Sequence, residues 1–543
     1  MIAQRSTGNS NLETEQPGST GANKVPLIPK GELIDEVYAV LDAPVDRWAV
    51  AATLESLGIR DVDARDEYGQ SLFDLAEEVF GVCRSRGLRP ITQPPVAARL
   101  RPPWVRFLVD YGQGWLFALP LVSQLSVLFL LRVSLFASLA LNQHQATVVI
   151  LGAVLSYIVT GGVIQSVSRR AYGYVENGLD HLARQLIFRM VRLGTGLVLL
   201  VALLILLLNV VTPVFDTGQI LLCLLYFVLL SELWLVFATF YLIKQPLLIS
   251  VWMFVGVAVV LVSYRILQWN LFLSQAIGMS LAGSLAWWYS RGVISTRAAR
   301  IRGSAALVRL PKDAIMAFVA GPYAAYGFLY FTFLFADRLM AWTAAKTPIP
   351  SLIWFRPAYE IGLDLSIIPL LVIAPVVEHA GREFSRQLEI WQSATEGFRL
   401  GILNQALRRH YLRQWCLVIL VGGISLGSAA VLFGVPFLHI PRLPFFVDET
   451  TRFVFVFGTL GYMLWSFGLL NAGYCLALNQ PGQVARILAM GLATNLLVGY
   501  VLSRLISYEY AVLGFVVGGL VFVAVSTRDV YRMLGEFYNL MTF

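Results

Sequence analysis

Charged side chains are scarce in this 543-residue sequence, in which Asp, Glu, Lys and Arg together make up 14%. Soluble domains carry roughly 25% charged residues, so this chain cannot cover a water-facing surface of its own size. Hydrophobic residues make up 57% of the sequence, and the mean hydropathy is +0.69. We therefore expect lipid to surround most of the chain.

The sequence also lacks the motifs of disulfide-rich, metal-binding and nucleotide-binding proteins. The four cysteines lie far apart, which excludes a disulfide framework, and the five histidines are scattered. The sequence contains neither HExxH nor GxxxxGK[ST], the motifs of zinc proteases and P-loop ATPases. We expect no catalytic residue, no bound metal and no cofactor, although coupling to H⁺ or Na⁺ stays open.

Acidic and basic residues are distributed unevenly along the chain. Residues 1–78 hold 15 acidic and 6 basic residues, whereas the remainder holds 18 acidic and 35 basic ones. A basic total can indicate nucleic-acid binding, but here the basic residues lie between apolar runs, where they set membrane topology. We expect no nucleic-acid partner.

The N-terminal part of the chain differs in composition from the rest. Residues 1–30 are rich in Ser, Thr, Gly and Asn and are predicted to be a disordered tail. Residues 31–88 predict a small, acidic, helical cytoplasmic domain, with Asp42 as the N-cap of one helix. Residues 89–112 contain five prolines and are predicted to form a semi-rigid linker. Helically spaced apolar residues predict the core of this domain: Leu33, Val37, Leu41, Val50, Leu54, Leu57, Leu72, Leu75, Ala76 and Val79.

From residue 113 onward, apolar runs of about 20 residues recur, the length that crosses a bilayer. They predict an all-α polytopic membrane protein with about twelve transmembrane helices in two six-helix lobes, residues 113–290 and 313–526. A basic cytoplasmic connection, residues 291–312, joins the lobes, and residues 527–543 form a cytoplasmic tail. Basic residues concentrate in alternate connections, which predicts that both termini are cytoplasmic.

The two halves share a weak internal repeat. Ser231 and Pro246 are matched by Ser466 and Pro481 at one common offset along the chain, with Gln before each proline. Together with the parallel pattern of basic loops, this indicates a six-plus-six duplication, which is typical of transporters. Within the second half, residues 379–415 have an apolar stripe at helical spacing and predict an amphipathic helix on the inner membrane surface.

Charged or amide side chains within spans are the candidate transport-pathway or ion-coupling residues, because such groups face protein or water rather than lipid. The densest group is Asp337, Arg338, Glu360 and Asp364. It predicts either an outward-facing polar vestibule or residues in the headgroup zone beside a belt residue, Trp342. The other candidates are Glu378, Glu232, Arg132, Asn471 and Asn495. Glu232 and Arg132 could pair, and the two asparagines could bind a sugar or join helices.

Short stretches of the second half resemble PelG-type exopolysaccharide transporters. Residues 331–342, FTFLFADRLMAW, resemble that family's Asp-Lys-(x)n-Trp stretch at the end of the seventh span, with Arg338 in place of Lys. Residues 358–369 and Glu378 resemble its Tyr-Asp, Ile-Pro and Glu pattern. Residues 474–495 are similar to its tenth-to-eleventh span connection, although Asn479-Gln480-Pro481 replaces the usual acidic and basic pair.

The resemblance implies membership of the multidrug/oligosaccharidyl-lipid/polysaccharide (MOP) exporter superfamily, with two lobes around a central cavity. It implies export or flipping of a polysaccharide or lipid-linked glycan across a bacterial cytoplasmic (inner) membrane, fed by a cytoplasmic glycosyltransferase and other synthase subunits. The acidic N-terminal domain is not part of that pattern. Two alternatives stay open: a small-molecule or multidrug exporter of the same fold, and a membrane glycosyltransferase or scaffold subunit.

Overall fold

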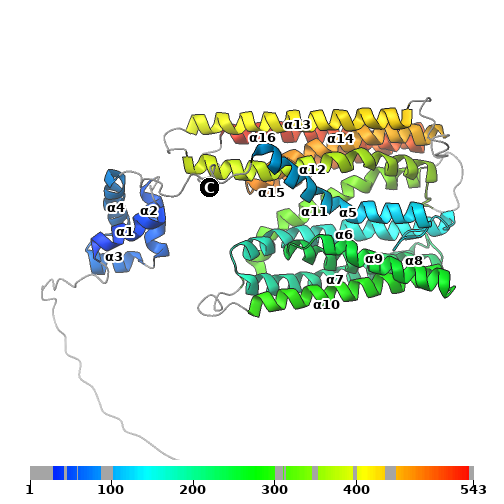
Figure 1. Cartoon of the computed structure of the whole chain (residues 1–543), viewed down its shortest axis with the longest axis horizontal. Helices are drawn as coiled ribbons and strands as arrows, with labels where there is room; N and C mark the ends of the chain where they lie inside the picture. The colour runs from blue at the N-terminus through cyan, green and yellow to red at the C-terminus, as the bar shows by residue number, and fades with distance from the viewer. Residues whose placement is uncertain are drawn as a thin grey trace, which may run out of the picture. The chain divides into compact units, whose positions relative to one another are not determined.

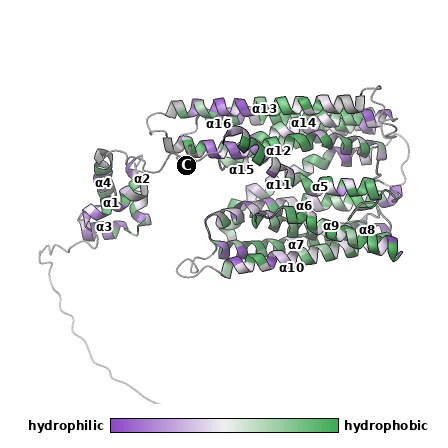
Figure 2. Ribbon diagram, viewed as in Figure 1, coloured by the Kyte–Doolittle hydropathy of each residue, from purple (hydrophilic) through white to green (hydrophobic). Residues whose placement is uncertain are grey.

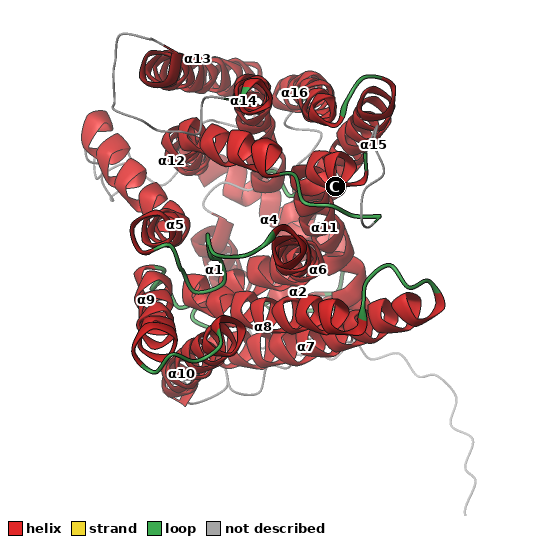
Figure 3. Cartoon of the chain, turned by 90° about the vertical axis from the view of Figure 1, so that its right-hand side faces the viewer, coloured by secondary structure: helices red, strands yellow, loops and turns green. Residues whose placement is uncertain are grey.

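The computed structural model describes residues 29–41, 46–57, 59–86, 102–299, 310, 313–344, 352–394, 400–434 and 448–536 (Figure 1). Contacts divide the chain into two compact units, residues 1–100 and 101–543. Regular secondary structure in the described ranges is helical in both units (Figure 3).

The N-terminal unit contains four short helices, α1 (Lys30–Leu41), α2 (Arg47–Ser56), α3 (Asp61–Tyr68) and α4 (Leu72–Arg86). Of the ten apolar residues predicted for its core, eight are buried and Leu57 is partly buried, whereas the side chain of Leu41 lies outside the described residues. The predicted N-cap was wrong: α2 begins after Asp46, whose carboxylate accepts a hydrogen bond from the Ala49 amide at 2.8 Å. Asp42 lies outside the described residues.

The second unit, within its described ranges, consists of twelve long helices. They are α5 (Pro103–Leu131), α6 (Gln143–Glu176), α7 (Asp180–Val211), α8 (Thr217–Leu242), α9 (Leu247–Leu261, continued by a π-helical turn, Val262–Ile266), α10 (Leu271–Ala299), α11 (Asp313–Thr343), α12 (Pro357–Ala394), α13 (Leu400–Gly434), α14 (Glu449–Ala477), α15 (Pro481–Leu505) and α16 (Ala511–Gly535).

Among the described residues, ten of these helices are long and apolar enough to cross a membrane. α5 adds an eleventh if its two parts, bent by 51°, count as one span. α10 is more polar, but its 29 residues extend about 43 Å, which exceeds the hydrocarbon thickness of roughly 30 Å. Figure 2 shows the long hydrophobic stretches along the helices of this unit. The chain is therefore a multi-pass membrane protein.

Helix pairing shows two six-helix lobes (Figures 1 and 3). In the first lobe α6 packs on α7 and α8, and α10 packs on α8 and α9. In the second lobe α12 packs on α13 and α14, and α16 packs on α14 and α15. Adding six to each label converts one set into the other. Between the lobes, α5 packs on α12 and α11 packs on α6, so these contacts follow the same symmetry.

The turn between the fourth and fifth helix is also repeated. Lys244 and Asn479, which are separated by the same offset as the repeated prolines, have positive φ angles of 61° and 56°. The next residues, Gln245 and Gln480, each donate an amide hydrogen bond of 2.9 Å to the carbonyl five positions earlier. Two turns with the same hydrogen bonds at the predicted offset support the duplication.

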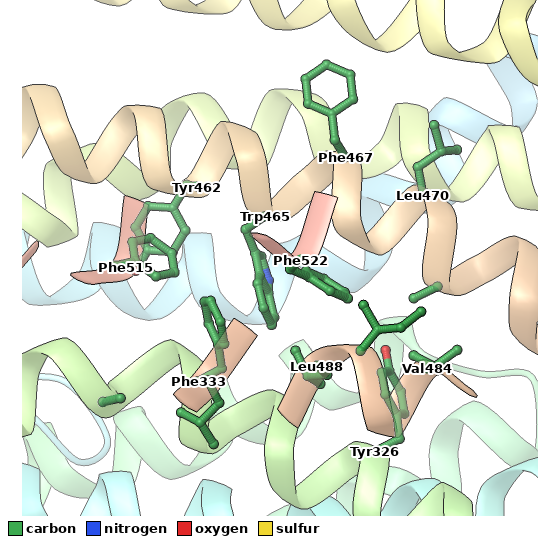
Figure 4. Packing of buried hydrophobic residues seen from close by; sticks show 14 of the residues in the cluster. Tyr326, Phe333, Tyr462, Trp465, Phe467, Leu470, Val484, Leu488, Phe515 and Phe522 are labelled. Atoms are coloured by element: carbon green, nitrogen blue, oxygen red, sulfur yellow. The ribbon is translucent and has the colours of Figure 1, made fainter. Parts of the chain in front are cut away.

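Aromatic side chains fill the centre of the second lobe, where α11, α14, α15 and α16 meet (Figure 4). The Trp465 ring stacks on Phe333 with centroids 4.6 Å apart and lies 5.3 Å from Phe522. Burial of such large rings stabilises the lobe against separation of its helices.

Two segments differ from their predicted roles. Residues 103–112, assigned to the linker, form the first turns of α5. Residues 379–394, assigned to a surface amphipathic helix, are the continuation of α12 without a break. Phe384 of that segment is fully buried and lies 4.2 Å from the Tyr474 ring, so the apolar stripe faces the second lobe. Residues 395–399 lie outside the described residues.

Gly327 lies where α11 of the second lobe is in close contact with α6 of the first lobe. A β-carbon there would collide with the backbone carbonyl of Gly161 on α6. We expect Gly327→Ala to force α6 and α11 apart and to destabilise the protein by about 1–3 kcal/mol, the usual cost of overpacking. Gly321→Ala, on the same helix with nothing within 4 Å, is the matched control and should be neutral or slightly stabilising. Thermal denaturation in lipid nanodiscs measures both, and equal melting temperatures would contradict the prediction.

Candidate functional site

Arg338 forms the centre of a buried charged cluster between the end of α11 and the start of α12. Its guanidinium donates through Nη1 to Glu360 Oε2 and through Nη2 to Asp364 Oδ1, the latter at 3.2 Å. The planar fork of Arg can bind two carboxylates at once, which a Lys ammonium does less well. The cluster therefore ties residue 338 to two acids on consecutive turns of α12.

Neutral donors complete the cluster. The Tyr359 hydroxyl donates to Asp337 Oδ2 at 2.7 Å, and the Trp342 indole donates to Glu360 Oε1 at 2.7 Å. Tyr359 and Trp342 are fully buried. Trp342 is therefore part of the buried cluster and does not face lipid as a membrane-belt residue.

The cluster contains more acidic than basic side chains, since three carboxylates surround one guanidinium. Asp337 and Glu360 are buried, whereas the Asp364 side chain is 49% exposed. A buried carboxylate is costly without a cation or donors, and both buried acids have them. The exposed Asp364 is the member that a polar ligand or ion could reach.

The two candidate asparagines join helices. Asn471 accepts from the Tyr411 hydroxyl at 2.7 Å and donates to Ser526 at 2.8 Å, which connects α13, α14 and α16. Asn495 donates to the Phe333 carbonyl at 3.3 Å and connects α15 with α11. Both are completely buried. These contacts match the helix-joining alternative.

The remaining candidates lie apart from the cluster. Glu232 on α8 accepts from the Thr195 hydroxyl on α7 at 2.9 Å. Arg132 is exposed at the C-terminal end of α5, and within the described residues no ion pair joins it to Glu232. Glu378 pairs at 3.1 Å with Arg382, one turn later on the same helix.

A second buried ionic network, not predicted from the sequence, connects the lobes at the opposite end of α12. Asp110 on α5 is 1% exposed and accepts two bonds from Arg386, at 2.7 and 2.8 Å. His379 Nδ1 lies 2.9 Å from the same carboxylate. Arg106 of α5 donates to Glu383 of α12 at 2.6 Å.

This network is called the interlobe ionic network below and comprises Arg106, Asp110, His379, Glu383 and Arg386. Glu360 and Glu383 lie on one helix, and their separation in sequence corresponds to about 35 Å along its axis. The charged cluster and the interlobe ionic network therefore lie near opposite membrane surfaces. Among the described residues, no group of three His, Cys, Asp or Glu could hold a metal ion.

The sequence matches no protein-family model, and it matches no curated protein. Its structure is similar to a mutant of the Vibrio cholerae MATE transporter VcmN, with TM-score 0.54 and 14% identity over 81% of this chain and 98% of that one. It is also similar to MATE in complex with MaL6, with TM-score 0.53 and 14% identity over 83% and 100%.

A third similar structure is a MOP superfamily transporter from Pyrococcus furiosus, with TM-score 0.51 and 13% identity over 79% and 95% of the two chains. Identities this low establish the fold alone. The second unit therefore has the fold of MATE transporters of the MOP superfamily.

Proposed function

We propose that this chain exports or flips a polysaccharide or lipid-linked glycan across the bacterial cytoplasmic membrane by alternating access of its two lobes. The observation that carries the proposal is the charged cluster. Asp337, Arg338, Glu360 and Asp364, the residues of the exopolysaccharide-transporter resemblance, gather at one end of the second lobe. A glycan is rich in hydroxyl groups and needs a polar path through lipid, and Asp364 offers an exposed acceptor there.

The interlobe ionic network supports movement of one lobe against the other. It joins α5 of the first lobe to α12 of the second through ion pairs. Ion pairs of this kind form or break as a unit, which suits an interface with two discrete arrangements. At the predicted cytoplasmic end, its rupture would admit substrate.

A cytoplasmic glycosyltransferase and other synthase subunits are the partners that fit this function. The acidic N-terminal unit would bind one of them, and membrane lipid surrounds the twelve helices. A small-molecule exporter of the same fold, or a glycosyltransferase or scaffold subunit, would use the same cluster differently.

Complementation of a deletion strain tests the assignment of the cluster. Asp337→Ala with Arg338→Ala should reduce surface polysaccharide at least tenfold at equal expression, because the polar path loses its cation and one acid. Glu449→Gln removes an exposed acid at the start of α14, at the same end of the lobe, and should leave the polymer unchanged. Unchanged polymer in the double variant, together with lost efflux of toxic compounds, would favour the small-molecule exporter.

A further inference from the structure

Glu232 is the only charged side chain in the central parts of the first-lobe spans. Apart from it, no Asp, Glu, Lys, Arg or His occurs in residues 113–131, 145–168, 193–211, 217–243, 247–264 and 271–290. The second lobe pairs its buried Glu360 with Arg338. In the first lobe the basic side chains, such as Arg169 and Arg265, lie toward the ends of their spans, and no described residue forms an ion pair with Glu232.

The contacts of Glu232 are neutral. Its Oε2 lies 2.9 Å from the Thr195 hydroxyl, and its Oε1 is buried without a hydrogen-bond partner among the described residues. The nearest charged residue along α7 is Arg192, one turn before Thr195, and it is exposed. In the central parts of the helices that pack against α8, the other titratable side chains are Tyr157, Tyr264 and Tyr289, and on α8 itself they are Cys223, Tyr226 and Tyr241. None of these supplies a cation. The Arg and His side chains of the neighbouring helices lie toward the helix ends.

The internal repeat shows that the fold does not need an acid at this position. The offset that relates the two halves places Phe467 of α14 opposite Glu232 of α8. Phe467 stacks on Trp415 with centroids 4.6 Å apart, so the second lobe fills the equivalent place with an apolar ring. An acidic residue at a membrane position whose equivalent in the other lobe is a packed apolar residue is a candidate functional residue.

Ionised Glu232 would be costly in these surroundings. A charged side chain at the bilayer centre costs about 3 kcal/mol or more, whereas one neutral hydrogen bond returns only about 1 kcal/mol. The protonated carboxyl fits, because its O–H can donate to the Thr195 hydroxyl. Release of that proton requires an arrangement of the first lobe in which water reaches the side chain.

We propose that Glu232 is a proton-binding site whose occupancy changes as the first lobe rearranges during transport. The inference rests on the proposed function for its role in transport, because a mobile first lobe is part of alternating access. The ligand is the proton, and the binding step is reversible: the O–H bond forms on the carboxylate from water and breaks to water. A gradient of protons would then favour one arrangement of the lobes over the other.

Infrared difference spectroscopy of the full chain in lipid nanodiscs tests the site with the proton as probe. At neutral pH, wild type minus E232Q should show the carbonyl stretch of a protonated carboxyl. T195V keeps Glu232 but removes the hydroxyl that is hydrogen-bonded to its carboxyl group, so the band should shift to higher frequency. This variant provides a second test if E232Q folds poorly. E360Q is the matched control, since Glu360 pairs with Arg338 and should contribute carboxylate bands.

The proposal would be overturned if Glu232 gave carboxylate bands at neutral pH. It would also be overturned if the carboxyl band stayed unchanged at alkaline pH in every ligand state. The proposed function is tested separately by the polymer assay. If E232Q retains full polysaccharide export in the presence and absence of a proton gradient, Glu232 has no role in transport while the exporter assignment stands.

Discussion

Arg338→Met is expected to abolish export and to destabilise the second lobe by about 3–5 kcal/mol, because it leaves buried Glu360 without its cation. Removing one member of a buried ion pair costs more than removing both, since the remaining charge has no partner. Thermal denaturation in nanodiscs and polymer export in a complemented deletion strain measure the two effects separately.

The double variant R338M/E360Q separates stability from function. Gln keeps an acceptor for the Trp342 indole, which lies 2.7 Å from Glu360 Oε1, and no charge remains unpaired between the two positions. We expect the double variant to recover most of the lost melting temperature while export stays absent. If the double variant recovered both the melting temperature and export, the cluster would have only a structural role. If it recovered neither, the geometry of the cluster would matter more than its charge balance.

Asp110→Asn is expected to weaken the contact between α5 and α12. Asp110 accepts two charge-assisted bonds from Arg386, and loss of its charge should cost about 2 kcal/mol, equivalent to roughly a 30-fold rise in the separated arrangement. Hydrogen–deuterium exchange should rise in residues 103–116 and 375–388. Export should fall because the lobes no longer close at this end.

Glu378→Gln is the control for that experiment. Glu378 is 45% exposed and pairs with Arg382 on the same helix. Arg382 keeps its own contacts with Asp110 and Gln113 of α5 when Glu378 is neutral, so the loss of this charge should leave both exchange and export near wild type. Equal exchange in Asp110→Asn and Glu378→Gln would mean that the interlobe ionic network does not hold the lobes together.

Span length and apolar spacing were sufficient to predict the helical, two-lobed architecture. The buried residues of the N-terminal unit follow the same rule, since Leu33, Val37 and Leu54 recur at helical spacing and are all buried. Helix ends were less predictable. α5 begins within the assigned linker at Pro103, and α12 continues past the expected membrane surface to Ala394. Tertiary contacts support these turns, because ion pairs join the start of α5 to α12 and Phe384 of α12 packs on Tyr474 of the second lobe.

The members of the charged cluster could be named from the sequence as the densest group of charges at span ends, although their spacing did not show that the side chains meet. Asp337 and Arg338 end one span and Glu360 and Asp364 begin the next, so a short connection brings them together. The interlobe ionic network was missed because Asp110 and His379 are 269 residues apart. One signal was present: His379, Glu383 and Arg386 follow the i, i+4, i+7 spacing of one helix face. Their partner on α5 is a tertiary contact that spacing does not reveal.

If this chain carries a glycan out of the cell, loss of the chain must change the polysaccharide that reaches the medium. Deletion of the gene in its own organism, followed by composition analysis of secreted, cell-associated and intracellular polysaccharide, measures that change. We expect one polymer to disappear from the secreted fraction while its precursors remain inside, and we expect wild type but not Arg338→Met to restore it. Secreted and intracellular polysaccharide unchanged by the deletion would contradict that expectation.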